Sequence, residues 1–143
     1  MAIEQQNTEK AFVNPSGEPY EIDRREQRLV LAYKAYLERA GSAITRQLIR
    51  PPGEAKPLFT DLYDRSRNNL VEAKGVGTRS AVRMAIGQLA DYGRFVDEAA
   101  RRAVLLPQRP RPDLEALLSA QGIAVVWESG RGTFEDNAGG RFT

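Results

Sequence analysis

The chain has 143 residues, of which 41% are hydrophobic and 28% are charged, as is typical of one soluble globular domain. It contains no cysteine and no histidine, which excludes disulfides, thiolate chemistry, histidine metal sites and Ser-His-Asp triads. No apolar run reaches the roughly 18–20 residues that span a bilayer, and the first residues lack a signal-peptide pattern, so we expect a cytoplasmic protein.

The net charge of +2 is unevenly distributed along the chain. Residues 1–73 hold 11 basic and 11 acidic side chains, whereas residues 74–112 hold 8 basic and 3 acidic ones, a net charge of +5. Residues 113–143 hold 2 basic and 5 acidic side chains, a net charge of −3. The basic central segment is typical of a phosphate-binding face, although a solvated arginine-rich helix has the same composition.

The first predicted element is a helix. Residues 1–21 are polar and contain two prolines, so we expect a loose N-terminal lead-in. Apolar residues then recur at three- and four-residue spacing, which predicts an amphipathic helix over residues 22–40 that ends at Gly41. The apolar positions of this helix are Leu29, Val30, Ala32, Tyr33, Tyr36 and Leu37.

Three strands are expected next. Residues 43–50 alternate loosely between apolar and polar side chains and predict a short strand, which Pro51-Pro52 stops. Residues 57–63 predict a second strand. Residues 64–69 have the polar composition of a hairpin turn, and residues 70–74 predict a third, short strand.

A second long helix is expected after this strand. Gly75 and Gly77 interrupt the strand, and Thr78 or Ser80 can cap the helix that follows, which we expect to reach about Arg102. Its apolar stripe consists of Val82, Ala85, Ile86, Leu89, Val96 and Ala99.

The last elements alternate between strand and helix. Residues 104–106 predict an apolar strand before a proline-rich loop. Asp113 is expected to cap a helix over residues 114–121, and residues 123–127 predict a final buried strand. The glycine-rich residues 128–143 are expected to be mobile or loosely packed.

The predicted order is α-β-β-β-α-β-α-β, which indicates an α/β fold with a central mixed β-sheet flanked by helices. The hairpin turn favours antiparallel pairing in the first part of the sheet, and the later helical crossovers favour parallel pairing. We therefore expect one domain over residues 22–127, between the N-terminal lead-in and a glycine-rich tail at 128–143.

The strongest chemical signal lies on the second and third predicted strands. Glu72 and Lys74 are two residues apart, so both side chains point to one face of a strand, while Ala73 faces the core. Asp61 lies on the preceding strand and would come alongside Glu72 if the two strands pair. Asp61, Glu72 and the backbone carbonyl of Ala73 form a candidate Mg²⁺ or Mn²⁺ site, since oxygen ligands favour these ions.

Such a site would hydrolyse phosphodiesters. A bound metal polarises the phosphate and lowers the pKa of an attacking water, and Lys74 would orient that water, lower its pKa or act as a base. Gln88 and Tyr92 are four residues apart on one helical face, which we expect to point toward the site. Arg79 and Arg83 near the helix start are expected, with Lys74, to contact nucleic-acid phosphates.

Each of these residues also has a purely structural interpretation. Asp61 could cap a turn, Glu72 and Lys74 could form a surface pair that contributes little, and the amide and the phenol could simply cover the helix. Asp64 competes as the first acid, but it is expected in the turn, where a ligand would be poorly held. The sequence Gly75-Val-Gly-Thr lacks the spacing and the lysine of a P-loop.

The order of these residues resembles a known family. Asp61, then Glu72-Ala-Lys74, then Gln88-x-x-x-Tyr92 resembles the PD-(D/E)xK nuclease superfamily, and the helical Gln-x-x-x-Tyr pattern is similar to its RecB-like branch. The resemblance implies a restriction-endonuclease-like fold. It also implies that the first three residues are the catalytic triplet and that the last two support them.

The resemblance covers roughly residues 22–127. It implies that Glu26, on the first helix, is a further candidate acid near the metal. The chain departs from the family at two points. Thr60 rather than a proline precedes the first acid, and the histidine or cysteine ligands of many RecB-like enzymes are missing.

The expected function is therefore a Mg²⁺-dependent DNA endonuclease of the restriction or phage-defence kind. The alternatives are a catalytically silent or accessory nucleic-acid-binding module of the same fold, a DNA-repair or toxin nuclease, and a small α/β protein that makes only protein contacts. The sequence has no helix-turn-helix or zinc-finger signal. We therefore expect target choice to lie in a homodimer, in a partner protein or in another domain.

Overall fold

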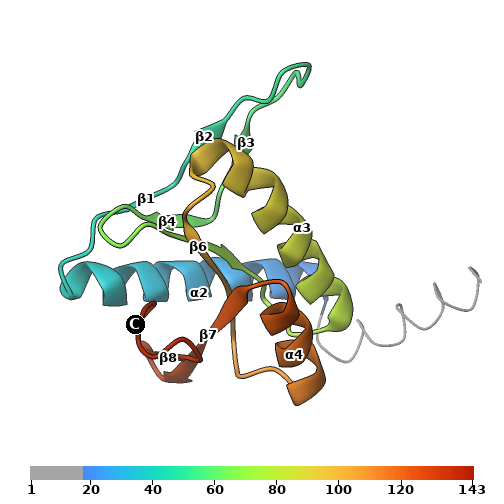
Figure 1. The fold of residues 1–143 in the computed structure, drawn as a ribbon. Helices are drawn as coiled ribbons and strands as arrows, with labels where there is room; N and C mark the ends of the chain where they lie inside the picture. The colour runs from blue at the N-terminus through green and yellow to red at the C-terminus, as the bar shows by residue number, and fades with distance from the viewer. Residues whose placement is uncertain (1–17) are drawn as a thin grey trace, which may run out of the picture.

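The computed structural model describes residues 18–143, and most of the predicted lead-in, 1–21, lies outside them. These residues form a mixed α/β structure with three helices around a curled mixed sheet (Figure 1). The elements in chain order are α2 (Pro19–Arg39), β1 (Ile44–Thr45), β2 (Leu48–Ile49), β3 (Leu58–Phe59), β4 (Leu62–Asp64), β5 (Asn69–Ala73), α3 (Arg79–Val96), β6 (Arg101–Leu106), α4 (Pro112–Ala120), β7 (Ile123–Gly130) and β8 (Thr133–Asp136).

The main sheet has six strands in the order β1-β4-β5-β6-β7-β8. The three central strands β5, β6 and β7 are parallel, and α3 and α4 provide the crossovers between them. The flanking pairs, β1 with β4, β4 with β5 and β7 with β8, are antiparallel. This arrangement confirms the expected mixed sheet with an antiparallel first part and parallel later strands.

Helices cover both faces of the sheet. The side chains of β5 alternate between the two faces and therefore belong to two cores. Val71 and Ala73 belong to the core under α2, whose buried residues include Leu29, Tyr33 and Leu37. Leu70 belongs to the core under α3 and α4, whose buried residues include Val82, Ala85, Leu89, Leu114 and Leu118. Glu72 therefore lies on the same face of β5 as α3.

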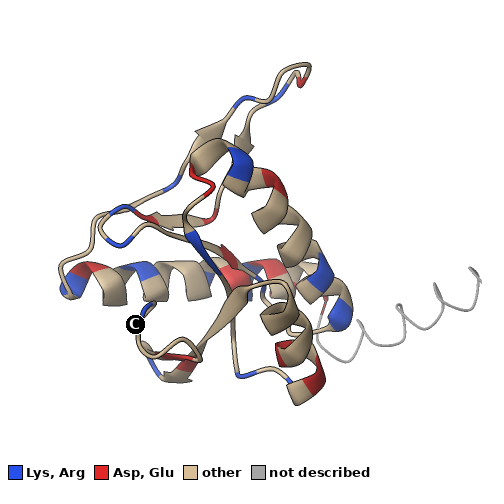
Figure 2. Cartoon of the chain, viewed as in Figure 1, with Lys and Arg blue, Asp and Glu red and all other residues tan. Residues whose placement is uncertain are grey.

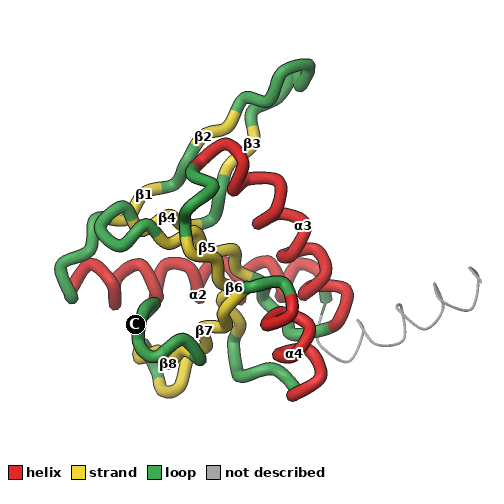
Figure 3. Tube along the Cα trace, viewed as in Figure 1, coloured by secondary structure: helices red, strands yellow, loops and turns green. Residues whose placement is uncertain are grey.

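Two of the predicted strands are each split in two. The expected strand 43–50 forms β1 and β2, and the expected strand 57–63 forms β3 and β4. One half of each joins the main sheet, and the other half forms the separate β2–β3 ribbon that projects from the body (Figure 3). The break occurs where the backbone N–H of Gln47 donates to the Thr60 hydroxyl over 2.9 Å.

The predicted helix 78–102 is too long. Helix α3 ends at Val96, since Asp97 has extended backbone angles and its carboxylate accepts the N–H of Ala99. Residues Arg101 and Arg102 begin strand β6 instead, where pairing with both β5 and β7 outweighs their helical preference. The start of the helix is as predicted, because the Thr78 hydroxyl accepts the N–H of Ala81.

The prediction for the helix over residues 114–121 needs a smaller correction. Helix α4 begins at Pro112, and its N-cap Arg111 makes no side-chain capping bond. Asp113 is therefore not the cap; it lies in the first turn, where its charge still favours the helix N-terminus.

The expectation of a loosely packed tail is wrong. Strand β7 continues to Gly130, and β8 pairs with it antiparallel. Phe142 is 2% exposed, and its carbonyl accepts the Tyr33 hydroxyl over 2.7 Å. The Asp136 carboxylate fixes the final turn by accepting the backbone N–H groups of residues 138, 140 and 142.

In the part of the chain that the structure describes, no helix is both long enough and apolar enough to cross a bilayer.

Candidate functional site

The two predicted acids lie next to each other. The β4–β5 register pairs Leu62 with Val71, which places Asp61 opposite Glu72. The backbone N–H of Asp61 donates to Glu72 Oε1 over 3.2 Å, and the N–H of Ala73 donates to Asp61 Oδ2 over 2.9 Å. These reciprocal bonds hold both carboxyl groups at the end of β5.

Glu72 is a buried acid in an unfavourable environment for its charge. Its side chain is 1% exposed. Burial, and then the hydrogen bond and negative charge of Asp61, raise the pKa of Glu72 to about 10, although Lys74 opposes the shift. Without another cation, the carboxyl pair therefore retains a proton at neutral pH. A divalent cation is the chemical alternative to that proton, because it would balance both carboxylates.

The predicted third ligand, the carbonyl of Ala73, lies on the correct side of the strand. In an extended strand, the N–H and C=O of one residue point the same way. The N–H of Ala73 points toward Asp61, whereas the N–H of Lys74 points to β6 and donates to the Leu105 carbonyl over 3.0 Å. The Ala73 carbonyl therefore faces the Asp61 side of β5.

Helix α3 brings the predicted amide and phenol to the acids. Tyr92 is half-buried, and its pKa is raised by burial and by the negative charges of Glu72 and Asp61, while a hydrogen bond with Gln88 lowers it. Gln88 Oε1 is buried and has no hydrogen-bond partner within the described residues. Because buried polar atoms are nearly always paired, this acceptor suits a donor group of a bound ligand or water.

Glu26 of α2 lies beside the acid pair. Its carboxylate accepts the N–H of Gly75 over 3.2 Å. Burial and then the charge of Asp61 raise the pKa of Glu26, and Lys74 opposes this shift. Across residues 18–143, no three acidic side chains form a group that could hold a metal ion, so Glu26 does not complete a three-carboxylate ligand set.

Lys74 supplies positive charge to this acidic cluster. It is half-buried at the end of β5. The pKa values of Glu26 and Glu72 are raised overall, and the positive charge of Lys74 offsets part of each rise. Its ammonium makes no ion pair with any described residue. It therefore stays available to an anionic ligand.

The two predicted phosphate-binding arginines lie at the start of α3, where Figure 2 shows basic residues. Arg79 forms an ion pair with Asp113 of α4, and both side chains are largely exposed. Arg83 is exposed in the next turn. Within the described residues neither arginine contacts the acid pair, so they belong to the surface beside it.

The competing acid, Asp64, has a structural role. It is 1% exposed and forms an ion pair with Arg67 over 3.2 Å. Its carboxylate also accepts the backbone N–H groups of Ser66 and Arg67. These bonds shape the hairpin turn between β4 and β5, and they occupy the oxygen atoms that a metal would need.

Gly75 was not predicted to matter for the site beyond ending a strand. A Cβ atom on Gly75 would lie 2.2 Å from the Ile22 carbonyl oxygen of α2. Its own carbonyl accepts a hydrogen bond from Arg25 over 3.2 Å. The close approach of Gly75 to α2 thus docks the segment that carries Lys74 against the helix that carries Glu26.

We therefore expect Gly75→Ala to lower the free energy of unfolding by about 1–3 kcal/mol, because backbone atoms must move to admit the methyl group. The matched control is Gly77→Ala in the same loop, where a Cβ would meet nothing within 4 Å. Thermal unfolding followed by circular dichroism measures both variants. Equal melting temperatures for the two variants would contradict this account of the loop.

Comparison with known proteins identifies no relative of this chain. No protein-family model matches the sequence, and no curated protein and no solved structure matches it significantly. The functional argument therefore depends on the residues of this chain.

Proposed function

We propose that the chain is a metal-dependent DNA endonuclease with a restriction-endonuclease-like fold, of the restriction or phage-defence kind. The observation that supports this most directly is the pairing of the buried Glu72 with the half-buried Asp61, which reciprocal hydrogen bonds hold together. Lys74 follows directly after β5, and Tyr92 of α3 approaches the acids together with its hydrogen-bond partner Gln88. The RecB-like resemblance predicts this combination of groups.

The residues present fit a divalent metal ion. Asp61, Glu72 and the Ala73 carbonyl are oxygen ligands on one side of β5, and with both carboxyl groups ionised the pair would carry more negative charge than Lys74 alone balances. When bound, Mg²⁺ or Mn²⁺ would supply Lewis-acid activation of the phosphate and of a water. Which of these two ions is preferred does not change the role of the side chains.

The remaining groups of the site have separate roles. The ammonium of Lys74 attracts a phosphate and orients it beside the acids. The Gln88 amide and the Tyr92 hydroxyl present a hydrogen-bonding edge on the α3 side of the site. Arg83 places positive charge on the adjoining surface, which suits a polyanionic substrate, and Arg79 would contribute there by exchanging its Asp113 partner for a phosphate.

A catalytically silent nucleic-acid-binding module of the same fold is the alternative. The observation that favours it is that each carboxyl group of the acid pair already accepts a backbone N–H, so one oxygen of each is occupied without a metal ion. Either a nuclease or a binding module could act as a homodimer or with a partner protein that selects the target. They differ in whether phosphodiester bonds are cut.

The decisive test is cleavage of supercoiled plasmid and of single-stranded DNA with Mg²⁺, Mn²⁺ or EDTA. We expect metal-dependent cutting by the wild type and its loss in Asp61→Ala. The matched control is Glu98→Ala, which removes an exposed acid outside the site. Binding of DNA without cutting by folded wild type, on plain and modified DNA, would favour the binding module instead.

A further inference from the structure

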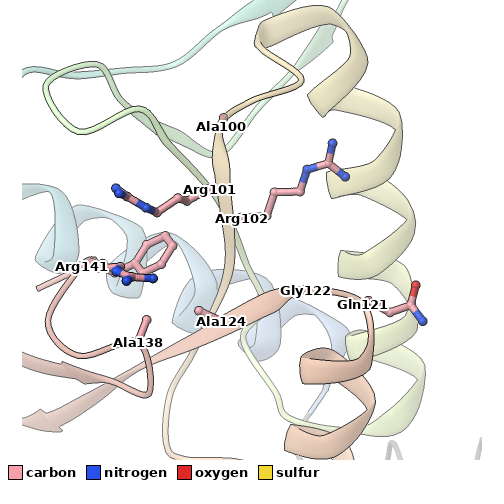
Figure 4. Close-up of a pocket in the computed structure, with 9 residues that line it drawn as sticks. Ala100, Arg101, Arg102, Gln121, Gly122, Ala124, Ala138 and Arg141 are labelled. Atoms are coloured by element: carbon pink, nitrogen blue, oxygen red, sulfur yellow. The ribbon is translucent and has the colours of Figure 1, made fainter.

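A second feature lies at the opposite end of the central strands. A hollow of about 320 Å³ opens where strands β6 and β7 begin (Figure 4). The strand register pairs Asn69 with Arg101 here and Ala73 with Leu105 at the acid pair. These positions are four residues apart, or about 13 Å along a strand. The hollow is therefore separate from the candidate nuclease site.

The hollow is rich in positive charge. Arg101, Arg102 and Arg141 line it together with the small side chains of Ala124 and Ala138. Figure 4 shows Arg101 and Arg141 extending to one side of β6, while Arg102 extends to the other side beside α3. Over residues 18–143, none of the three arginines forms an ion pair.

The neighbouring acids already have other partners. Asp64 pairs with Arg67, and the Asp136 carboxylate accepts three backbone N–H groups. Asp97 accepts hydrogen bonds from the Asn68 amide and from the N–H of Ala99. Among the described residues, none of these acids forms an ion pair with an arginine that lines the hollow, so an anion would meet guanidinium groups that have no carboxylate partner.

A buried acceptor lies next to the arginines. Asn69 is 1% exposed, and its amide nitrogen donates to the Arg141 carbonyl over 2.9 Å. This bond fixes the orientation of the amide, and Asn69 Oδ1 has no hydrogen-bond partner among the described residues. Asn69 does not itself line the hollow, but this bond holds the backbone of Arg141, which does, in place.

We propose that this hollow binds a phosphate monoester. Guanidinium groups bind phosphate oxygens through paired N–H donors, and the volume of the hollow is at the small end of the range for ligand pockets. A monoester carries close to two negative charges near neutral pH, whereas an internal DNA phosphodiester carries one, so a pair of guanidinium groups favours the monoester. The two sources of this chemistry are a free nucleotide and the phosphorylated end of a strand.

The test compares ligands that carry a phosphate group with a matched oligonucleotide that lacks the terminal phosphate. Binding is measured by calorimetry in EDTA at fixed ionic strength, because salt screens such contacts. The probes are inorganic phosphate, adenosine monophosphate, and one short single-stranded oligonucleotide with a 5′-phosphate or a 5′-hydroxyl. We expect saturable binding of the phosphorylated probes. Tighter binding of the mononucleotide identifies a nucleotide site, and tighter binding of the phosphorylated oligonucleotide identifies a strand-end site.

The variant Arg101→Gln/Arg141→Gln should weaken binding of the phosphorylated probes at least about tenfold, since it removes both charges. Arg39→Gln, an exposed arginine at the end of α2, is the matched control. Asp61→Ala should bind normally, which separates this proposal from the nuclease proposal. Unchanged affinity in the double variant, or equal affinity for the two oligonucleotides, would overturn the proposal.

Discussion

Glu72→Gln is expected to make the protein more stable and, at the same time, to abolish metal-dependent cleavage. Glutamine keeps the shape of the side chain but removes its ionisation. Because the folded protein holds Glu72 buried beside Asp61, the charged form costs stability that an amide does not. We expect the free energy of unfolding at pH 9 in EDTA to rise by about 1–3 kcal/mol. For a chain of this size, that is about 3–5 °C in melting temperature per kcal/mol.

The pH dependence of stability follows from the same shift. Folding raises the pKa of Glu72 from 4.5 to about 10, so the folded protein binds the proton more tightly than the unfolded chain does. The stability that this proton contributes is fully present below pH 4.5 and is lost as pH rises through about 10. The difference between wild type and Glu72→Gln should therefore be small at pH 5 and large at pH 9.

A metal ion should reverse this loss of stability in the wild type only. An ion that binds only the folded protein adds to the free energy of unfolding and so raises the melting temperature, more so at higher ion concentration. We expect Mg²⁺ or Mn²⁺ to stabilise the wild type at pH 8 and to leave Glu72→Gln unchanged, with cleavage at least about 100-fold slower in the variant. Glu98→Gln is the exposed control. A stability difference that does not change with pH would contradict the proposed buried acid pair.

The sequence allowed the acid pair to be predicted because its position depends on local rules. The polar turn at residues 65–68 joins two short strands, and Asn68 adopts the left-handed conformation, φ 56°, that such a turn uses. Once the strands pair, the two-residue period of β5 places Glu72 on the α3 face with Leu70, and Lys74 follows directly after the strand. The four-residue period of α3 then places Gln88 and Tyr92 on one helical face. None of these steps requires knowledge of distant contacts.

Features that depend on distant contacts were mispredicted or missed. The tail is rich in glycine, so its composition indicated a mobile segment, yet Phe134 and Phe142 are buried in the core under α2. The packing of Gly75 against Ile22 joins segments some 50 residues apart, and local patterns carry no sign of it. The orphan acceptor of Asn69 likewise results from pairing between β5, β6 and the end of the chain.

Lys74→Ala is expected to slow cleavage by about 100-fold or more while leaving metal binding intact, because Lys74 contributes charge and donates no oxygen ligand. The structure places its ammonium close enough to lower the pKa values of both Glu26 and Glu72. A positive charge in that position would attract the phosphate oxygens of a substrate in the same way. The metal-induced rise in melting temperature should therefore persist in Lys74→Ala, which is the result that separates this variant from Glu72→Gln.

Lys74→Arg distinguishes the two roles that a lysine can have here. Arginine preserves the positive charge but cannot give up a proton at ordinary pH. If Lys74 acts through its charge, as its effect on both acids indicates, Lys74→Arg should retain cleavage within about tenfold of the wild type. Lys34→Arg on the exposed face of α2 controls for the exchange itself. Lys74→Arg as inactive as Lys74→Ala would instead assign proton transfer to Lys74, because the charge would be present and the reaction would still fail.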